Sequence, residues 1–252
     1  MLAGVTATRF DEFAPIAIGH DHRVFVLTGA GISAESGVRT FRDANGLWEQ
    51  YPVETVASPE GWEQDPGLVW RFYSQRRAQV ETVEPNAAHV ALADLERKLG
   101  DRLFLCTQNV DPLHERAGSA RVRHMHGELM KSRCGDECGR APFEDHGLYE
   151  SADAIARCEC GARVRPHIVW FGEVPFFMDE IAREIASCDV FVTIGSSGAV
   201  YPAAGFVRAA RERPDVRTVY VGPELPDNAR AFDECRLGKA TEVVPSLFEV
   251  GR

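Results

Sequence analysis

The sequence predicts an α/β protein with a doubly wound parallel sheet and a smaller inserted domain. Short apolar runs at 23–28, 102–107 and 188–195 each end at glycine or polar residues, as strands of a buried parallel sheet do. Helical patterns lie between these runs, and alternation of this kind favours a parallel sheet covered on both faces. Two segments, 42–86 and 128–167, interrupt the alternation and predict the inserted domain.

Further elements follow from the same patterns. Apolar runs at 216–222 and 240–244 and a short one near 121–125 are candidate strands. Helices are predicted at 85–100, 178–188 and 202–213, the first with Ala88, Leu92, Leu95 and Leu99 on one face. We therefore expect a large domain of residues 1–41, 87–127 and 168–252, with 42–86 and 128–167 forming a helical module and a cysteine-bearing module.

Length and charge limit the functions that fit. The chain has 252 residues, 44% of them hydrophobic, which is enough for a sizeable core. A net charge of -10 argues against a general nucleic-acid-binding surface, which needs a basic face. No run approaches the roughly 20 apolar residues of a membrane helix. Asp11 and Glu12 near the start argue against a secretory signal, so we predict a cytoplasmic protein without membrane partners.

A glycine-rich loop follows the first predicted strand. In TGAGISAESG (28–37), Gly29, Ala30 and Gly31 let backbone N–H groups approach a pyrophosphate at the start of a short helix. The spacing G-x-G-x5-G differs from the dinucleotide fingerprint, and no lysine stands where an ATPase needs one. An ordinary tight turn is the alternative. Ligands of doubly wound sheets bind beyond the carboxyl ends of the strands, so this loop should share a crevice with 107–111 and 194–200.

Two further motifs offer polar side chains at strand ends. TQNVD (107–111) places Gln108, Asn109 and Asp111 after the second strand, although Asp111 before a proline would also cap a helix. HMHGE (124–128) offers His124 and His126, and histidine titrates near neutral pH and suits general-base work. The residues alone do not choose between these two histidines.

A cysteine cluster predicts a metal. Four of the seven cysteines fall at 134–160, with spacings Cys-x3-Cys and Cys-x-Cys. Four thiolates bind zinc tetrahedrally and stabilise a small module that has little core of its own. Reduced, unligated thiols are the alternative.

Two stretches could contact a substrate. Tyr73 and Arg76 in WRFYSQRR share a helix face, and the pair offers a hydroxyl and a planar fork that suits a carboxylate. A solvated basic face is the alternative. PHIVWFGEVP (166–175) predicts an apolar strand whose exposed edge would pair with an extended peptide, or else a core strand.

Taken together, these motifs resemble one family. GAGISAESGVRTFR, TQNVD, HMHGE, the cysteine cluster and PHIVWFGE occur in the order seen in sirtuins, and the resemblance covers roughly residues 22–250. It implies a Rossmann-like NAD-binding domain with a small zinc-bearing domain, and removal of acyl groups from protein lysines. Ala34, Thr40 and the Tyr73-x-x-Arg76 pair resemble the class III branch, bacterial in type, which acts on succinyl- and malonyl-lysine.

The resemblance also implies roles for single residues. His126 matches the catalytic base, whereas His124 does not. The NAD contacts implied are Gly29, Ala30, Gly31, Ile32, Glu35, Thr40, Phe41, Arg42, Trp48, Gln108, Asn109, Asp111, Gly195, Ser196, Ser197, Gly222, Glu224 and Ala240. The substrate contacts implied are Tyr73, Arg76, Val169, Phe171, Gly172 and Glu173. The implied ligands of one structural zinc ion are Cys134, Cys138, Cys158 and Cys160.

The chain departs from the family in two places. The cysteine spacings differ from the usual C-x2-C, and Gly222-Pro223-Glu224 replaces Asn-x-Glu, so one side-chain contact to the adenosine ribose should be lost.

The implied reaction removes succinyl, malonyl and acetyl groups from lysine and yields nicotinamide and O-acyl-ADP-ribose. Nicotinamide leaves, the acyl oxygen attacks the ribose, and His126 then deprotonates a ribose hydroxyl that attacks the resulting alkylimidate. Three alternatives stay open: a Rossmann oxidoreductase, an NAD-dependent mono-ADP-ribosyltransferase, and a catalytically weak NAD- and zinc-binding interaction module.

Overall fold

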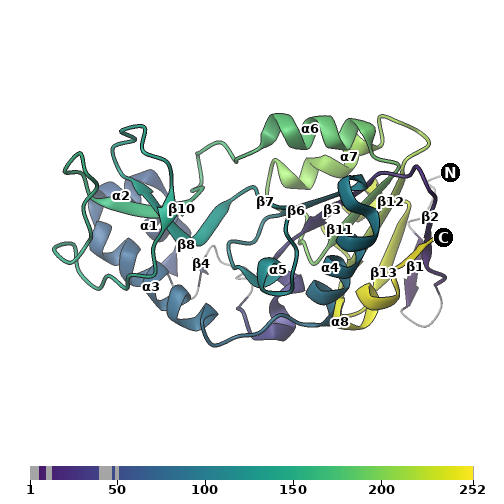
Figure 1. Cartoon of the computed structure of the whole chain (residues 1–252), viewed down its shortest axis with the longest axis horizontal. Helices are drawn as coiled ribbons and strands as arrows, with labels where there is room; N and C mark the ends of the chain where they lie inside the picture. Colours follow the sequence, from purple (N-terminus) through teal and green to yellow (C-terminus); the bar gives the residue numbers. More distant parts are fainter. Residues whose placement is uncertain (1–5, 10–12, 40–46, 49–50, 252) are drawn as a thin grey trace.

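The computed structural model describes residues 6–9, 13–39, 47–48 and 51–251. A large part built on a sheet and a smaller part with helices and a second sheet lie side by side (Figure 1). Among the described residues, no helix is long and apolar enough to cross a membrane.

The large part is a doubly wound parallel sheet, as predicted. Its strand order is β1-β13-β12-β11-β3-β6-β7, and every neighbouring pair is parallel. The strands are β1 (Thr6–Arg9), β3 (Val24–Thr28), β6 (Leu103–Thr107), β7 (Val122–His124), β11 (Val190–Ile194), β12 (Arg217–Gly222) and β13 (Glu234–Leu237). From β3 the chain winds to β6 and β7, then returns to β11 on the other side. The topological switch point therefore lies between β3 and β11, where such sheets bind ligands.

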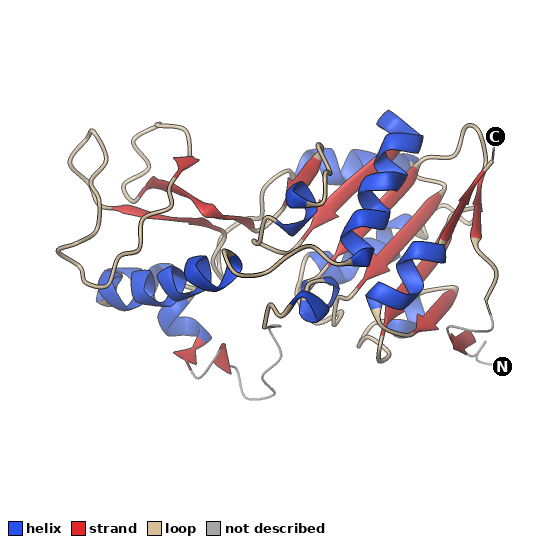
Figure 2. Cartoon of the chain, turned by 60° about the horizontal axis from the view of Figure 1, so that its bottom comes forward, coloured by secondary structure: helices blue, strands red, loops and turns tan. Residues whose placement is uncertain are grey.

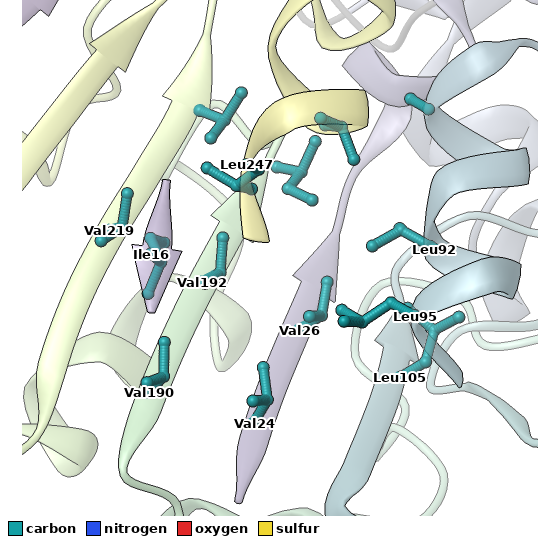
Figure 3. Packing of buried hydrophobic residues seen from close by; sticks show 14 of the residues in the cluster. Ile16, Val24, Val26, Leu92, Leu95, Leu105, Val190, Val192, Val219 and Leu247 are labelled. Atoms are coloured by element: carbon teal, nitrogen blue, oxygen red, sulfur yellow. The ribbon is translucent and has the colours of Figure 1, made fainter. Parts of the chain in front are cut away.

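Helices cover both faces of this sheet, because its central strands are apolar on both sides. On β3, Val24 and Val26 join one core cluster, and Phe25 and Leu27 join another. The first face packs against α4 (Ala87–Leu99) and α8 (Ala240–Val243), as Figure 3 shows for part of the cluster. The second face packs against α6 (Met178–Ser187) and α7 (Phe206–Ala210). The predicted apolar face of 85–100 is confirmed, since Ala88, Leu92, Leu95 and Leu99 are all buried in the first cluster.

The smaller part combines three helices with an antiparallel sheet of order β10-β8-β9 (Figure 2). Its helices are α1 (Val53–Val56), α2 (Pro59–Gln64) and α3 (Pro66–Val80), and its strands are β8 (Gly127–Cys134), β9 (Phe143–Glu144) and β10 (Val164–Ile168). Ser58 and Asp65 cap α2 and α3, each followed by a proline in the first helical turn. Residues of both segments, such as Trp70 and Leu129, lie in one core together with Trp170. The domain boundaries themselves stay a prediction.

Short elements complete the chain. β2 (Ile16–Ile18) pairs with β14 (Phe248–Val250), and β4 (Leu47–Trp48) pairs with β5 (Tyr51–Pro52). α5 (Leu113–Arg116) follows β6, and 3-10 turns occur at 30–32, 34–36, 100–102, 203–205, 229–231 and 244–246.

Three predictions from local sequence need correction. The run at 240–244 forms helix α8 at Ala240–Val243 and the start of a 3-10 turn at Val244, and α8 packs on α4 and β12 rather than pairing as a strand. The helix predicted at 202–213 is shorter, a 3-10 turn followed by α7 at Phe206–Ala210. The strand predicted at 166–175 ends at Ile168, after which the chain turns through Gly172 at a φ of 90°.

Candidate functional site

One cavity of about 260 Å³ lies where the carboxyl ends of β3, β6 and β11 meet the smaller part. Its lining includes residues 29–31 after β3, 108–111 after β6 and 195–197 after β11. The three loops predicted to share a crevice therefore do so. Residues 168–173 and Tyr73 line the side that belongs to the smaller part.

The glycine-rich loop at 29–31 is hydrogen-bonded to the loop that follows β11. The N–H of Gly29 donates to Ile194 O at 2.9 Å, and the N–H of Gly31 donates to Gly195 O at 2.8 Å. A Cβ at Gly31 would lie 2.7 Å from the Cα of Gly195, which itself has a φ of 65°. Only glycine at both positions allows this approach. The contact brings two of the loops implied in nucleotide binding to one point.

A buried hydrogen-bond network joins the polar residues of two loops. The Asn109 amide donates to Ser33 Oγ at 3.1 Å, and Ser33 Oγ donates to Asp111 at 3.1 Å. Asp111 also accepts from the N–H of Leu113, the first residue of α5, at 3.2 Å, whereas the N-cap position of α5 is Pro112. Burial raises the pKa of Asp111, although its hydrogen bonds from Leu113 and Ser33 oppose the shift.

The side chains of the two histidines of HMHGE lie in different environments. His126 is half-buried, lines the cavity and lies with Nδ1 3.1 Å from Gln108 O. Burial lowers the pKa of His126, which favours its neutral form near pH 7. His124 does not line the cavity; its ring lies between Asn109 O and the Glu115 carboxylate, both at 2.8 Å. Geometry therefore separates two residues that the sequence left equivalent.

Most of the residues implied in substrate binding form one wall of the cavity. Val169, Phe171, Gly172, Glu173 and Tyr73 line it. The Glu173 carboxylate accepts from Arg165 at 2.7 Å, from Arg133 at 3.1 Å and from the N–H of Trp170 at 2.7 Å. These bonds hold the loop in shape, so the contact that Glu173 makes with a substrate stays a prediction.

Tyr73 and Arg76 lie on α3 as predicted, but only Tyr73 lines the cavity. Tyr73 is fully buried and its hydroxyl accepts from the Trp170 indole at 3.1 Å. The Arg76 guanidinium stacks on the Phe72 ring, 3.2 Å from its centroid, and donates to Phe72 O. Its contact with an acyl carboxylate stays a prediction.

The other residues implied in NAD binding are spread more widely. Gln108 donates to Ser196 Oγ at 3.0 Å, and Glu35 accepts from the N–H of Thr241 at 3.2 Å beside Ala240. Ile32, Glu35, Gly222, Glu224 and Ala240 do not line the cavity. A Cβ at Gly222 would lie 2.2 Å from the Tyr220 hydroxyl, so Tyr220 fills the space next to this departure from the family pattern.

Part of the predicted site lies outside the described residues. This applies to Thr40, Phe41 and Arg42, and to the side chain of Trp48, whose backbone belongs to β4.

The cysteine cluster comes together despite its unusual spacing. The sulfur atoms of Cys134, Cys138, Cys158 and Cys160 all lie within 4.8 Å of one another. Two of the sulfur pairs, Cys134 with Cys160 and Cys138 with Cys158, are 3.5 and 3.6 Å apart. Tetrahedral zinc with Zn–S bonds of about 2.3 Å needs sulfur atoms about 3.8 Å apart. The four donors therefore fit one structural zinc ion.

Sequence reasoning missed several residues of the site. Ser33 links Asn109 to Asp111, and its place in GAGIS was the available signal. Tyr201 lines the cavity with 67% of its surface exposed, and only its position after the IGSSG loop hinted at this. Arg133 and Arg165, which hold Glu173, carried no local signal because their partner comes from another segment.

The match to known proteins covers most of the chain. A model described as the Sir2 family matches residues 29–202. The NAD-dependent protein deacylase of Pasteurella multocida is 53% identical over 225 residues, which cover 88% of this chain and 95% of that protein. The one from Escherichia coli K12 is 51% identical over 241 residues, covering 95% and 85% respectively.

Solved structures of Sir2 homologues also resemble this chain. A Sir2 homologue in complex with NAD is 39% identical with a TM-score of 0.81, covering 90% of this chain and 88% of that one. A variant Sir2 homologue in complex with ADP-ribose is 38% identical with a TM-score of 0.82, covering 90% and 91%. With this fold, cavity and cysteine cluster, the chain belongs to the Sir2 family, and the resemblance to sirtuins is confirmed.

Proposed function

We propose that this protein is an NAD-dependent protein-lysine deacylase that removes succinyl and malonyl groups as well as acetyl. The observation that carries the proposal is that His126, Asn109, Asp111 and Tyr73 surround one cavity at the switch point of the sheet. The names of the curated relatives support the deacylase activity. One related solved structure holds a p53 peptide and NAD, and another is bound to a myristoylated histone peptide, which supports an acylated protein as substrate. A cytoplasmic location remains part of the proposal.

The residues of the cavity suit the chemistry. NAD supplies the ADP-ribosyl group that accepts the acyl group. Gly29 and Gly31, whose N–H groups are bonded to Ile194 O and Gly195 O, carry no side chains and so allow close approach to the loop backbone on the phosphate side. In this proposal, Asn109 contributes an amide and Asp111 a carboxylate near the ribose, where positive charge would develop. His126, whose pKa is lowered by burial, is neutral near pH 7 and able to accept a proton from a ribose hydroxyl.

The proposed preference for an acidic acyl group depends on two residues of α3. Tyr73 reaches the cavity, and Arg76 is one helical turn away on the same helix. If the Arg76 side chain rotated away from the Phe72 ring and toward the cavity, its guanidinium would reach the acyl carboxylate. A hydrogen bond to a charged group contributes about 1.5–3 kcal/mol, which corresponds to roughly 10- to 150-fold in kcat/KM.

The test compares one peptide carrying acetyl-, malonyl- or succinyl-lysine. Arg76→Met should lower kcat/KM for succinyl-lysine roughly 10-fold or more and leave acetyl-lysine nearly unchanged. Arg71→Met is the matched control, because Arg71 lies on the same helix and its side chain is 43% exposed. Equal losses on both substrates would contradict the assignment of Arg76.

The same assay separates the competing activities. Mass spectrometry should show loss of the acyl group from the peptide, and absorbance at 340 nm should show no NADH. ADP-ribose added to the protein would instead support a mono-ADP-ribosyltransferase. His126→Tyr should abolish deacylation in a folded protein, and retained turnover would contradict the general-base role.

A further inference from the structure

His124 lies between two hydrogen-bond acceptors. Its Nδ1 is 2.8 Å from the backbone oxygen of Asn109, and its Nε2 is 2.8 Å from the Glu115 carboxylate. The side chain is only 5% exposed, whereas that of Glu115 is 43% exposed. Glu115 belongs to α5 and His124 to β7, so the imidazole links these two elements beside the loop of residues 107–111.

Only the charged form of this imidazole satisfies both contacts. A neutral imidazole has one N–H and one lone pair, whereas an imidazolium has two N–H groups. A carbonyl and a carboxylate can only accept, so a neutral ring would turn its lone pair toward one of them. Both distances are those of good hydrogen bonds. The geometry alone therefore requires a proton on each nitrogen.

The surrounding charges agree with this protonation state. Burial by itself would lower the pKa of His124, but the hydrogen bond and charge of Glu115, the Asn109 oxygen and the charge of Glu128 outweigh burial and raise it. Asp111 also faces this group, and the charge of His124 opposes the rise in the pKa of Asp111 that burial causes. Among the described residues His114 is a further neighbour, and burial lowers its pKa so that it is neutral.

The group that His124 holds is part of the cavity. The Asn109 N–H donates to Thr107 Oγ1 at 3.0 Å, and its side chain donates to Ser33 at 3.1 Å. The His124 bond to the Asn109 oxygen is thus the third of three contacts that fix this residue. Without it, a buried carbonyl would lose its partner, and the amide and the Asp111 carboxylate two residues later would lose their orientation.

We propose that His124, held as an imidazolium between Asn109 and Glu115, is a positioning residue for the NAD pocket and sets an upper pH limit on NAD binding. The inference rests on the proposed contact of Asn109 and Asp111 with NAD. His124 touches no substrate in this role and acts through the loop that it holds. Deprotonation removes one of its two hydrogen bonds and the positive charge near Asp111, so NAD affinity falls as the pH rises through the pKa of His124.

The test measures the dissociation constant of NAD from about pH 6 to about pH 10 by calorimetry, without an acyl substrate. The wild type should lose affinity on the alkaline side by about tenfold, the effect of one lost buried hydrogen bond. His124→Asn places an amide nitrogen near the position of Nδ1 and cannot titrate, so its affinity should be flat on the alkaline side. Glu115→Gln should also be flat, because a glutamine amide can donate to the Nε2 of a neutral imidazole.

Glu84→Gln is the matched control, since it removes one exposed carboxylate elsewhere and should keep the wild-type profile. Thermal unfolding at each pH shows that the variants remain folded, and Glu115→Gln serves the test alone if His124→Asn does not fold. A flat wild-type profile, or an alkaline loss that persists unchanged in a folded variant, would overturn the proposal.

The kinetic experiment separates this inference from the proposed function. With an acyl-lysine peptide, the alkaline loss should appear in KM for NAD and not in kcat at saturating NAD. Absence of deacylation with a normal alkaline loss of NAD binding would refute the deacylase proposal and leave the role of His124 intact. Deacylation without any change in the NAD profile between wild type and variants would refute only the role of His124.

Discussion

Replacing Glu173 with glutamine should destabilise the loop that forms the substrate side of the cavity. The carboxylate of Glu173 is bonded twice by Arg165, at 2.7 and 3.0 Å, and twice by Arg133, at 3.1 and 3.2 Å. It also accepts from the N–H of Trp170 at 2.7 Å. Glutamine has the same shape, but it carries no charge and turns an NH₂ group toward one of the two guanidinium groups.

The size of the effect follows from burial. Removing one partner of a buried ion pair costs about 3–5 kcal/mol, because the other charge is left uncompensated. The side chain of Arg165 is 6% exposed, but Arg133 and Glu173 are 16% and 20% exposed, so we take the lower end, about 3 kcal/mol. For a chain of this length, each kcal/mol lowers Tm by about 2–4 °C, so Tm should fall by about 6–12 °C.

Thermal unfolding near pH 7 measures this change, with Glu159→Gln as control. Glu159 pairs with Arg140 at 3.2 Å but is 83% exposed, and such a surface pair contributes little. The control should therefore stay within about 2 °C of the wild type. A Tm of Glu173→Gln within that same margin would refute the reasoning.

The pH dependence gives a second check. Burial would raise the pKa of Glu173, but the Arg165 hydrogen bond, the Trp170 N–H and the two positive charges lower it overall. A lowered pKa gives stabilisation that is complete above the value of the unfolded chain and is lost as pH falls through the folded value. The Tm difference between wild type and Glu173→Gln should therefore shrink in acid.

Three other predictions follow. Chelation should remove one zinc ion per chain and loosen residues 134–160, because Cys134, Cys138, Cys158 and Cys160 lose the ion that would join them. Since Cys134 and Cys158 belong to the core that contains Trp70 and Trp170, the near-UV circular dichroism of these tryptophans should change, and an unchanged spectrum in metal-free protein would contradict the prediction. Gly31→Ala should weaken NAD binding by on the order of tenfold in calorimetry, since its Cβ would lie 2.7 Å from Gly195 Cα; unchanged affinity would show that the loops can separate at no cost. Because the pKa of His126 is lowered, kcat/KM should fall on acidification only at pH values below the ordinary titration range of histidine, where the base becomes protonated. A fall that begins at a pH above this range would assign the general base to another residue.

The fold was predictable where local pattern and tertiary context agree. The buried strands β3, β6 and β11 are continuous apolar runs that end at glycine or polar residues. The face of α4 repeats at helical spacing. In contrast, residues 240–244 have the composition of a strand, and packing on α4 decides that they are helical. Such short segments have little preference of their own, so their neighbours in space determine their structure.

The candidate site shows the same division. The residue types of TGAGIS, TQNVD and HMHGE were visible in the chain, and so was their order. The choice between His124 and His126 came from the family resemblance and not from the residue types, and in the structure the two side chains differ in what faces them. Ion pairs such as Glu173 with Arg165 and Arg133 depend on turns that bring separate segments together.

The sequence by itself determined the fold class, the family and the set of chemical groups, since these depend on apolar periodicity and on short motifs with fixed spacing. The tertiary structure alone decided which groups meet. It brought four cysteines with irregular spacing to within 4.8 Å, filled the space beside Gly222 with Tyr220, and placed His124 between two acceptors. The physical reason is that hydrogen bonds, ion pairs and ligand sets require contact in space, and contact between distant segments is a property of the folded chain.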